Sequence, residues 1–109
     1  MDDERFAAEV VRDQSGRRGS GDRAIRSALA AKGVAPETAA AAMAGLGDEA
    51  ERALELATSR APRLSGLPAE AAFRRLHGLL VRRGYSPGVA RDACRAALAS
   101  LPDGDFDPA

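Results

Sequence analysis

The sequence contains one histidine and one cysteine, and these are the first residues to consider for catalytic chemistry. General acid–base catalysis needs a titratable group near the reacting centre, and nucleophilic catalysis needs a thiol or hydroxyl activated by a base. His77 follows Leu76 on a predicted arginine-rich helix, which favours a solvated or half-buried surface position over a general base. Cys94 falls on the apolar stripe of a predicted helix, which favours a small core residue over a reactive thiol. The sequence therefore predicts no catalytic residue and no enzyme activity.

Four acidic residues lie close together in the middle of the sequence: Asp48, Glu49, Glu51 and Glu55. Carboxylates at this density can attract a metal ion. However, acidic side chains are also favourable in the first turn of a helix, where they interact with the helix dipole. A structural role is the better interpretation, so we expect neither a metal nor a cofactor.

Arginine is the residue type that points to binding. The chain has 16 basic and 16 acidic residues and a formal net charge of zero, but the basic residues are almost all arginine and are unevenly placed. Arginine gives bidentate contacts to phosphates and carboxylates and steers association through its charge, although a solvated helix face would explain these residues equally well. The candidate partner-binding residues are Arg74, Arg75, Arg82, Arg83, Arg91, Arg95, Arg17, Arg18, Arg23 and Arg26.

The composition predicts helices at nearly every position. Alanine, arginine, leucine and glutamate dominate, while β-branched and aromatic residues are scarce. Alanine makes up about half of the hydrophobic residues, so the core should be thin. No stretch is long and apolar enough to span a bilayer, and the acidic start is unlike a signal peptide, so we expect a soluble, cytoplasmic protein that does not bind a membrane. The predicted fold class is all-α.

Apolar periodicity and the positions of glycine and proline predict six helices. The first runs from Asp3 to about Asp13, and a glycine- and serine-bearing run, residues 15–21, breaks the pattern. The second helix is expected to end at Gly33, and the third to run from Pro36 to the Gly45/Gly47 pair. The fourth should run from an Asp48 cap to about Ala61–Pro62, and the fifth from Pro68 to Gly84. The sixth should begin at Ser86–Pro87. Residues 102–109 read as a disordered acidic tail.

The two halves of the chain are similar at an offset of 51 residues. Residues 29–36, Leu-Ala-Ala-Lys-Gly-Val-Ala-Pro, fall on residues 80–87, Leu-Val-Arg-Arg-Gly-Tyr-Ser-Pro. Each half reads as a three-helix repeat, residues 2–47 and residues 48–101. Because such a unit cannot bury its apolar face alone, the repeats should stack into an elongated body.

The ordered motifs resemble the RecX family, small bacterial proteins that restrain the RecA recombinase and are built from three-helix repeats. The motifs are Asp2-Asp3-Glu4-Arg5-Phe6-Ala7, Arg18-Gly19 before Ile25…Leu29-Ala-Ala-Lys32-Gly33-Val34, the Asp48-Glu49 opener, and Phe73-Arg74-Arg75-Leu76…Leu80-Val81-Arg82-Arg83-Gly84-Tyr85-Ser86. The resemblance covers about residues 2 to 100. Two features depart from it: family members usually have another repeat before the first motif, and residues 38–44 are mostly alanine where larger aliphatic side chains are usual.

The resemblance implies a regulator that binds RecA or the RecA–DNA filament and dampens ATP hydrolysis and strand exchange, acting as a monomer with no chemistry of its own. A basic surface on a narrow body would suit the groove of that filament. Two alternatives remain open at this point. One is a module that binds DNA directly through arginine–phosphate contacts, and the other is a helical scaffold for a different protein partner.

Overall fold

The structure, a computed structural model, describes residues 2–101, and this part of the chain is helical without any strand. The all-α prediction is confirmed. The elements are α1 (Asp3–Arg12), a π-helical turn η1 (Asp13–Arg17), α2 (Asp22–Ala31), α3 (Pro36–Met43), α4 (Glu49–Arg60), a 3₁₀ turn η2 (Ala61–Leu64), α5 (Ala69–Arg82) and α6 (Pro87–Ala99). The predicted acidic tail lies outside the described residues. No helix in the range 2–101 is long and apolar enough to cross a membrane.

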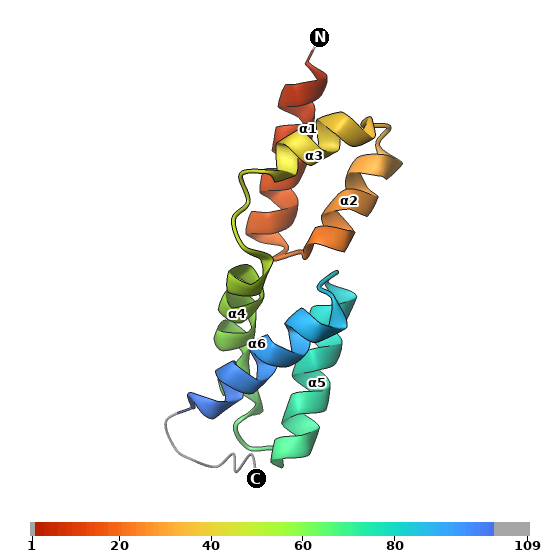
Figure 1. The fold of residues 1–109 in the computed structure, drawn as a ribbon. Coiled ribbons are helices and arrows are strands. Elements are labelled where there is room, and N and C mark those ends of the chain that lie inside the picture. The colour runs from red at the N-terminus through yellow and green to blue at the C-terminus, as the bar shows by residue number, and fades with distance from the viewer. Residues whose placement is uncertain (1, 102–109) are drawn as a thin grey trace.

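The six helices form a rod of two three-helix units placed end to end (Figure 1). The principal extents are 53 × 18 × 18 Å and the Cα radius of gyration is 15.7 Å. A compact domain of this length would have a radius of gyration of about 13 Å. The prediction of an elongated body is therefore confirmed.

Local sequence signals set most of the helix ends. The side chain of Asp48 accepts a hydrogen bond from the backbone N–H of Ala50 at the start of α4, and Ser86 accepts one from Val89 at the start of α6. Both caps were predicted, and both satisfy backbone donors that have no partner inside the helix. Gly33 and Gly84, which correspond in the repeat alignment, both adopt positive φ, +81° and +102°. The two halves thus share backbone conformation as well as sequence.

The first α-helix ends at Arg12, close to the predicted end at Asp13, but the predicted break at residues 15–21 begins later than expected. The chain does not leave the helix at Asp13 but continues through a π-helical turn to Arg17, and only residues 18–21 form the connection. The backbone N–H of Arg18 donates to the carbonyl of Asp13, five residues earlier, at 3.4 Å. Glycine costs about 1 kcal/mol relative to alanine inside a helix but does not block a helical backbone as proline does, so the helical path can continue through Ser15 and Gly16 in a π-helical turn.

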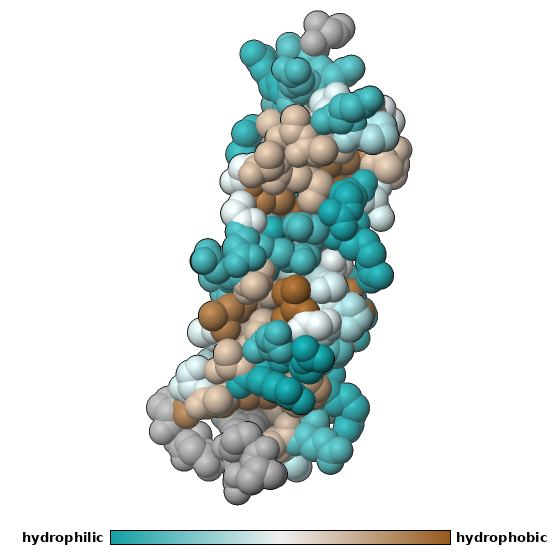
Figure 2. Space-filling model, in the orientation of Figure 1, coloured by the Kyte–Doolittle hydropathy of each residue, from teal (hydrophilic) through white to brown (hydrophobic). Residues whose placement is uncertain are grey.

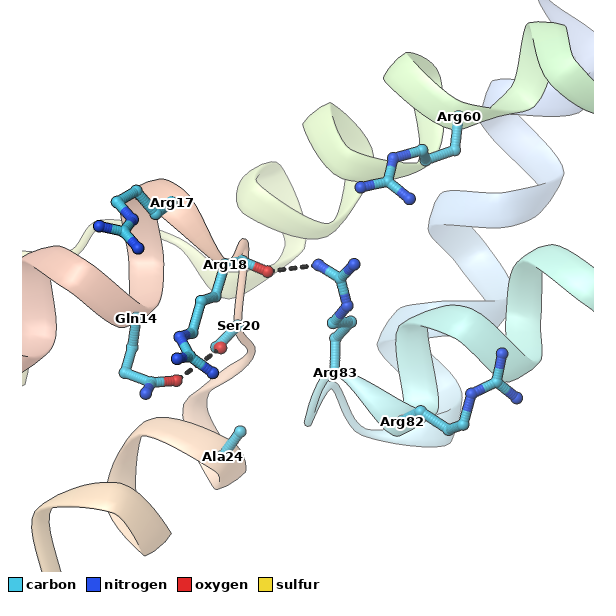
Figure 3. A pocket seen from close by; sticks show the side chains of 8 residues that line it. All are labelled: Gln14, Arg17, Arg18, Ser20, Ala24, Arg60, Arg82 and Arg83. Carbon is cyan, nitrogen blue, oxygen red and sulfur yellow. Dashed lines mark hydrogen bonds between the residues drawn. The ribbon is translucent and has the colours of Figure 1, made fainter.

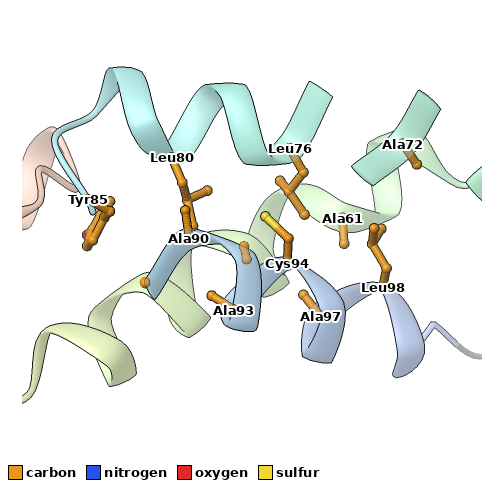
Figure 4. Packing of buried hydrophobic residues seen from close by; sticks show 12 residues of the cluster. Ala61, Ala72, Leu76, Leu80, Tyr85, Ala90, Ala93, Cys94, Ala97 and Leu98 are labelled. Carbon is orange, nitrogen blue, oxygen red and sulfur yellow. The ribbon is translucent and has the colours of Figure 1, made fainter. Parts of the chain in front are cut away.

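Each repeat has its own core. In the first repeat the buried side chains come from α1, α2 and α3: Ala7, Val10, Val11, Ile25, Leu29 and Ala39. The core of the second repeat is larger and includes Leu76, Leu80, Tyr85, Cys94 and Leu98 (Figure 4). Cys94 is fully buried, so its predicted role as a core residue is confirmed. Burial also raises the pKa of its thiol from 9.0 to about 11, which leaves it unreactive at neutral pH.

Candidate interaction surface at the junction of the two repeats

The start of α2 receives its capping groups from the other repeat. Gly21 occupies the N-cap position and has no side chain to offer, so the first backbone N–H groups of this helix need partners elsewhere. Repeat two supplies them through the loop after α5 and the first turn of α4. The bonds are Gly21 N–H to Arg83 O at 2.8 Å, Arg23 N–H to Gly84 O at 3.2 Å, and Asp22 N–H to Glu49 Oε2 at 3.0 Å.

Side chains of repeat two add a second set of hydrogen bonds across the junction. Arg52 donates to the carboxylate of Asp22 at 2.9 Å and to the carbonyl of Ser20 at 3.1 Å. The hydroxyl of Tyr85 donates to the carbonyl of Gly19 at 2.9 Å, and the Arg83 guanidinium donates to the carbonyl of Arg18. In Figure 2 a hydrophilic band crosses the rod between the more apolar surfaces of the two repeats. The junction is thus polar and fixed by directional bonds, with the two hydrophobic cores on either side.

A hollow of about 490 Å³ opens beside this junction. Figure 3 shows that its lining comes from both repeats, with η1 and the start of α2 on one side and the ends of α4 and α5 on the other. Five of the eight lining residues are arginines. The lining consists of Gln14, Arg17, Arg18, Ser20, Ala24, Arg60, Arg82 and Arg83.

The positive charge of the hollow is only partly balanced. The carboxylate of Asp13 lies 3.5 Å from Arg17 and 3.7 Å from Arg18. No carboxylate of residues 2–101 lies within 4 Å of the guanidinium groups of Arg60 and Arg82, and Arg83 donates to a neutral carbonyl. Several like charges in one hollow repel each other, so their assembly favours an anionic partner.

The ten arginines singled out in the sequence do not all gather in one place. Arg17, Arg18, Arg82 and Arg83 line the hollow together. Arg83 also holds the junction, which gives it a structural role. The remaining six are exposed and outside the hollow: Arg23 and Arg26 on α2, Arg74 and Arg75 on α5, and Arg91 and Arg95 on α6.

Sequence reasoning missed Arg60. It stands in the last turn of α4, and only the fold places it opposite residues of the first repeat. It opens the arginine-rich stretch of residues 60–95, and that position was the only signal available.

His77 and two members of the acidic cluster, Asp48 and Glu49, have structural partners. The His77 ring stacks on Phe73 with ring centroids 5.4 Å apart, and its Nε2 lies 3.1 Å from the carbonyl of Pro87. His77 is half-buried, as predicted. The side chain of Asp48 caps α4, and Glu49 accepts a hydrogen bond from the Asp22 N–H at the junction. These two members of the acidic cluster therefore have structural roles. Within residues 2–101 no group of three or more His, Cys, Asp or Glu side chains could hold a metal ion.

Comparison with known proteins agrees with this architecture. Residues 2–43 match the model of the second three-helix domain of RecX. The regulatory protein RecX of Mycolicibacterium smegmatis is 40% identical over 106 residues, which cover 92% of this chain and 56% of the relative. The chain belongs to the RecX family. The family assignment made from the motifs in the sequence is thereby confirmed.

Other RecX proteins show the same extent of similarity. Regulatory protein RecX of Thermobifida fusca is 38% identical over 100 residues, and that of Corynebacterium efficiens is 37% identical over 105 residues. These matches cover 90% of this chain and 54% and 50% of the relatives. The chain therefore spans about half the length of the curated relatives that it matches. No solved structure matches it.

Proposed function

We propose that this RecX-family chain binds RecA or the RecA–DNA filament and restrains ATP hydrolysis and strand exchange. Through RecA it would act on DNA recombination, DNA repair and the SOS response. The relatives carry the name of a regulatory protein, and the family resemblance implies RecA as the partner.

The observation that carries the proposal is a narrow rod with a concentration of arginines at its middle. The hollow brings Arg17, Arg18, Arg60, Arg82 and Arg83 together where the two repeats meet. A rod about 18 Å across fits a groove more readily than a globular body does, and unbalanced positive charge would steer it to an acidic filament surface.

Exposed arginines extend this charge away from the hollow. Arg75 precedes Arg82 on α5 by two helical turns, about 11 Å along the axis, and lies on the same side of the helix, and Arg74 is its neighbour. Arg91 and Arg95 are one turn apart on α6, and Arg23 and Arg26 are on α2. We propose that these side chains, together with the arginines of the hollow, contact the partner.

The mode of action proposed here is binding without chemistry. The buried thiol of Cys94 has a pKa raised to about 11, and His77 is engaged by the carbonyl of Pro87. Neither residue has the base or nucleophile beside it that catalysis would require. Inhibition should therefore depend on the ratio of this chain to RecA and not on time.

Direct binding tests the proposal. The purified chain, labelled with a fluorophore, is titrated with RecA filaments assembled on single-stranded DNA, with RecA alone and with the DNA alone. The proposal requires saturable binding to RecA or its filament that is stronger than binding to the DNA alone. Binding to DNA of equal strength, with no gain from RecA, would instead support the direct DNA-binding alternative.

A further inference from the structure

We propose that the hollow at the repeat junction is a phosphate site shared by the two repeats, and that its occupation holds the repeats in their observed arrangement. The site goes beyond the proposed function, because the isolated chain would bind its ligand without RecA. The residues assigned to it are Gln14, Arg17, Arg18, Arg60, Arg82 and Arg83.

Arginine side chains from three separate elements line the hollow. Two come from η1 and its C-terminal neighbour, one from α4, and two from α5 with its C-cap (Figure 3). The amide oxygen of Gln14 accepts a hydrogen bond from Ser20 at 2.8 Å, which leaves the Gln14 NH₂ group as a further donor. The volume of about 490 Å³ falls in the range of small-molecule sites, about 300 to 1,000 Å³.

The five arginines of the hollow repel one another. Among residues 2–101 the one carboxylate that forms an ion pair with any of them is that of Asp13, which contacts Arg17 and Arg18. The π-helical turn that carries Gln14 and Arg17 is also an uncommon conformation, and such turns occur frequently at functional sites. An anion in the hollow would relieve the repulsion among the guanidinium groups.

The arrangement of donors in the hollow suits a phosphate better than a carboxylate. A phosphate group carries up to two negative charges and presents several oxygens in a tetrahedral arrangement, so it can accept from several guanidinium groups at once, whereas a carboxylate has two oxygens in one plane. No aromatic side chain of residues 2–101 lines the hollow, so this part of the chain offers no stacking platform for a base there. The site should therefore recognise phosphate and not the rest of the molecule that carries it.

The hollow lies beside the hydrogen bonds that join the two repeats. The hydrogen bonds from Gly21 N–H to Arg83 O and from Arg23 N–H to Gly84 O cross the same seam that the hollow lies beside. A ligand that contacts Arg17 and Arg18 from repeat one and Arg60 and Arg82 from repeat two binds only while the repeats are docked. By linkage, its binding must stabilise the docked state.

The experiment measures binding of inorganic tripolyphosphate to the whole chain by calorimetry at constant ionic strength. The test variant is Arg60→Gln/Arg82→Gln, because neither side chain takes part in the hydrogen bonds of the junction. The matched control is Arg91→Gln/Arg95→Gln, which removes the same charge from outside the hollow. We expect binding at least about tenfold weaker for the test variant and unchanged for the control. Circular dichroism checks that both variants fold.

Hydrogen exchange tests the link to the junction. With tripolyphosphate bound, exchange of the Gly21 and Arg23 amides should slow, while exchange at amides inside α6 should not change. Equal weakening in the test and control variants would overturn the proposal, because it indicates general charge attraction. The proposal also fails if tripolyphosphate does not bind, or if citrate, a tricarboxylate, binds as tightly. Unchanged exchange at Gly21 and Arg23 would overturn the stabilisation of the junction.

A second titration separates the two sources of phosphate. A fluorescent dT15 oligonucleotide is added, followed by unlabelled tripolyphosphate. Binding of the oligonucleotide with displacement by tripolyphosphate supports the site with a nucleic-acid backbone as its ligand. Binding of tripolyphosphate alone supports the site with a mobile phosphate compound. RecA is absent from all these measurements, so loss of phosphate binding with intact RecA binding refutes only this inference, and the reverse result refutes only the proposed function.

Discussion

Gly21 and Gly84 meet at the junction of the two repeats at a distance that excludes any side chain. A Cβ on Gly21 would lie 2.5 Å from the carbonyl carbon of Gly84, and a Cβ on Gly84 would lie 2.5 Å from the Cβ of Ala24. Gly84 also has φ of +102°, which residues with a side chain rarely adopt. The close approach of these two backbones makes the hydrogen bond from Gly21 N–H to Arg83 O possible.

Alanine at either glycine should separate the repeats. We expect Gly21→Ala and Gly84→Ala each to lower the free energy of unfolding by about 2 kcal/mol or more, because the added methyl meets backbone atoms or Ala24. Urea unfolding followed by circular dichroism measures this change. A broadened transition with a smaller denaturant dependence would show that the two cores unfold independently once the junction is lost.

Gly33→Ala is the control for backbone strain. Gly33 has φ of +81°, but no atom lies within 4 Å of the position of an added Cβ. The substitution Gly33→Ala should therefore lower the free energy of unfolding only by the strain of a positive φ, about 1 to 2 kcal/mol. The unfolding transition should stay cooperative. If Gly33→Ala and Gly84→Ala had the same effect, steric contact across the junction would not be what requires Gly84.

The sequence was sufficient for the fold class and the helix caps because these depend on local signals. Proline at residues 36 and 87, the caps Asp48 and Ser86, and the apolar stripe that includes Cys94 all act within a few residues of the chain. The repeat pattern likewise gave the elongated shape. None of these inferences needed a contact between distant segments.

The junction and the hollow could not be predicted because they depend on contacts between residues far apart in the chain. Arg52 reaches Asp22, 30 residues away, and Tyr85 reaches Gly19, 66 residues away. Arg60 enters the hollow only because α4 continues the line of α1 in the rod. Runs of arginine identified the charge, but only the fold separates those that line the hollow from those on other faces.

Arg52 should be the strongest polar link between the repeats. Its side chain is 15% exposed and donates to both the Asp22 carboxylate and the Ser20 carbonyl. We expect Arg52→Ala to lower the free energy of unfolding by about 2 to 3 kcal/mol, because Asp22 loses its charge partner. A double-mutant cycle with Asp22→Ala should give a coupling of about 1 kcal/mol or more. Simple additivity of the two substitutions would contradict this role.

Arg52→Lys is not expected to restore stability. A guanidinium can donate to two acceptors in fixed directions, whereas an ammonium group is a single point donor on a flexible stem. The free energy of unfolding of Arg52→Lys, measured in urea, should therefore lie between the values for wild type and Arg52→Ala. Wild-type stability in Arg52→Lys would show that only the charge matters.

Stability should fall at alkaline pH because of Cys94. Burial raises the pKa of its thiol from 9.0 to about 11, so the unfolded chain loses this proton first as the pH rises. The contribution of the protonated Cys94 thiol to the free energy of unfolding is fully present below pH 9 and is lost between pH 9 and about 11. At about 1.4 kcal/mol per pKa unit, the loss is on the order of 2 to 3 kcal/mol.

Cys94→Ala isolates this effect. The difference in unfolding free energy between wild type and Cys94→Ala should be constant below pH 9 and change by on the order of 2 to 3 kcal/mol up to pH 11. Tyr85, whose pKa is also raised mainly by burial, is present in both proteins, and its contribution above pH 10 cancels in the difference. A difference independent of pH would contradict a buried, protonated thiol.

Tyr85→Phe tests the hydrogen bond from its hydroxyl to the Gly19 carbonyl. Tyr85 is 1% exposed, and this bond is 2.9 Å long. We expect the free energy of unfolding to fall by about 1 kcal/mol, because the ring still fills its place in the core while the Gly19 carbonyl loses its donor. Faster hydrogen exchange at Gly21 in Tyr85→Phe would show that the loosening occurs at the junction. Unchanged stability and exchange would mean that the ring alone matters.

Restraint of RecA by this chain is measured as the DNA-dependent ATPase rate of RecA with increasing amounts of the chain. The test variant is Arg74→Glu/Arg75→Glu/Arg82→Glu, and the matched control reverses three charges elsewhere, Arg5→Glu/Arg12→Glu/Lys32→Glu. We predict that the wild-type chain and the control inhibit RecA in proportion to their concentration and that the test variant does not. An ATPase rate unaffected by the wild-type chain, or equal inhibition by the wild-type chain and the test variant, would contradict this prediction.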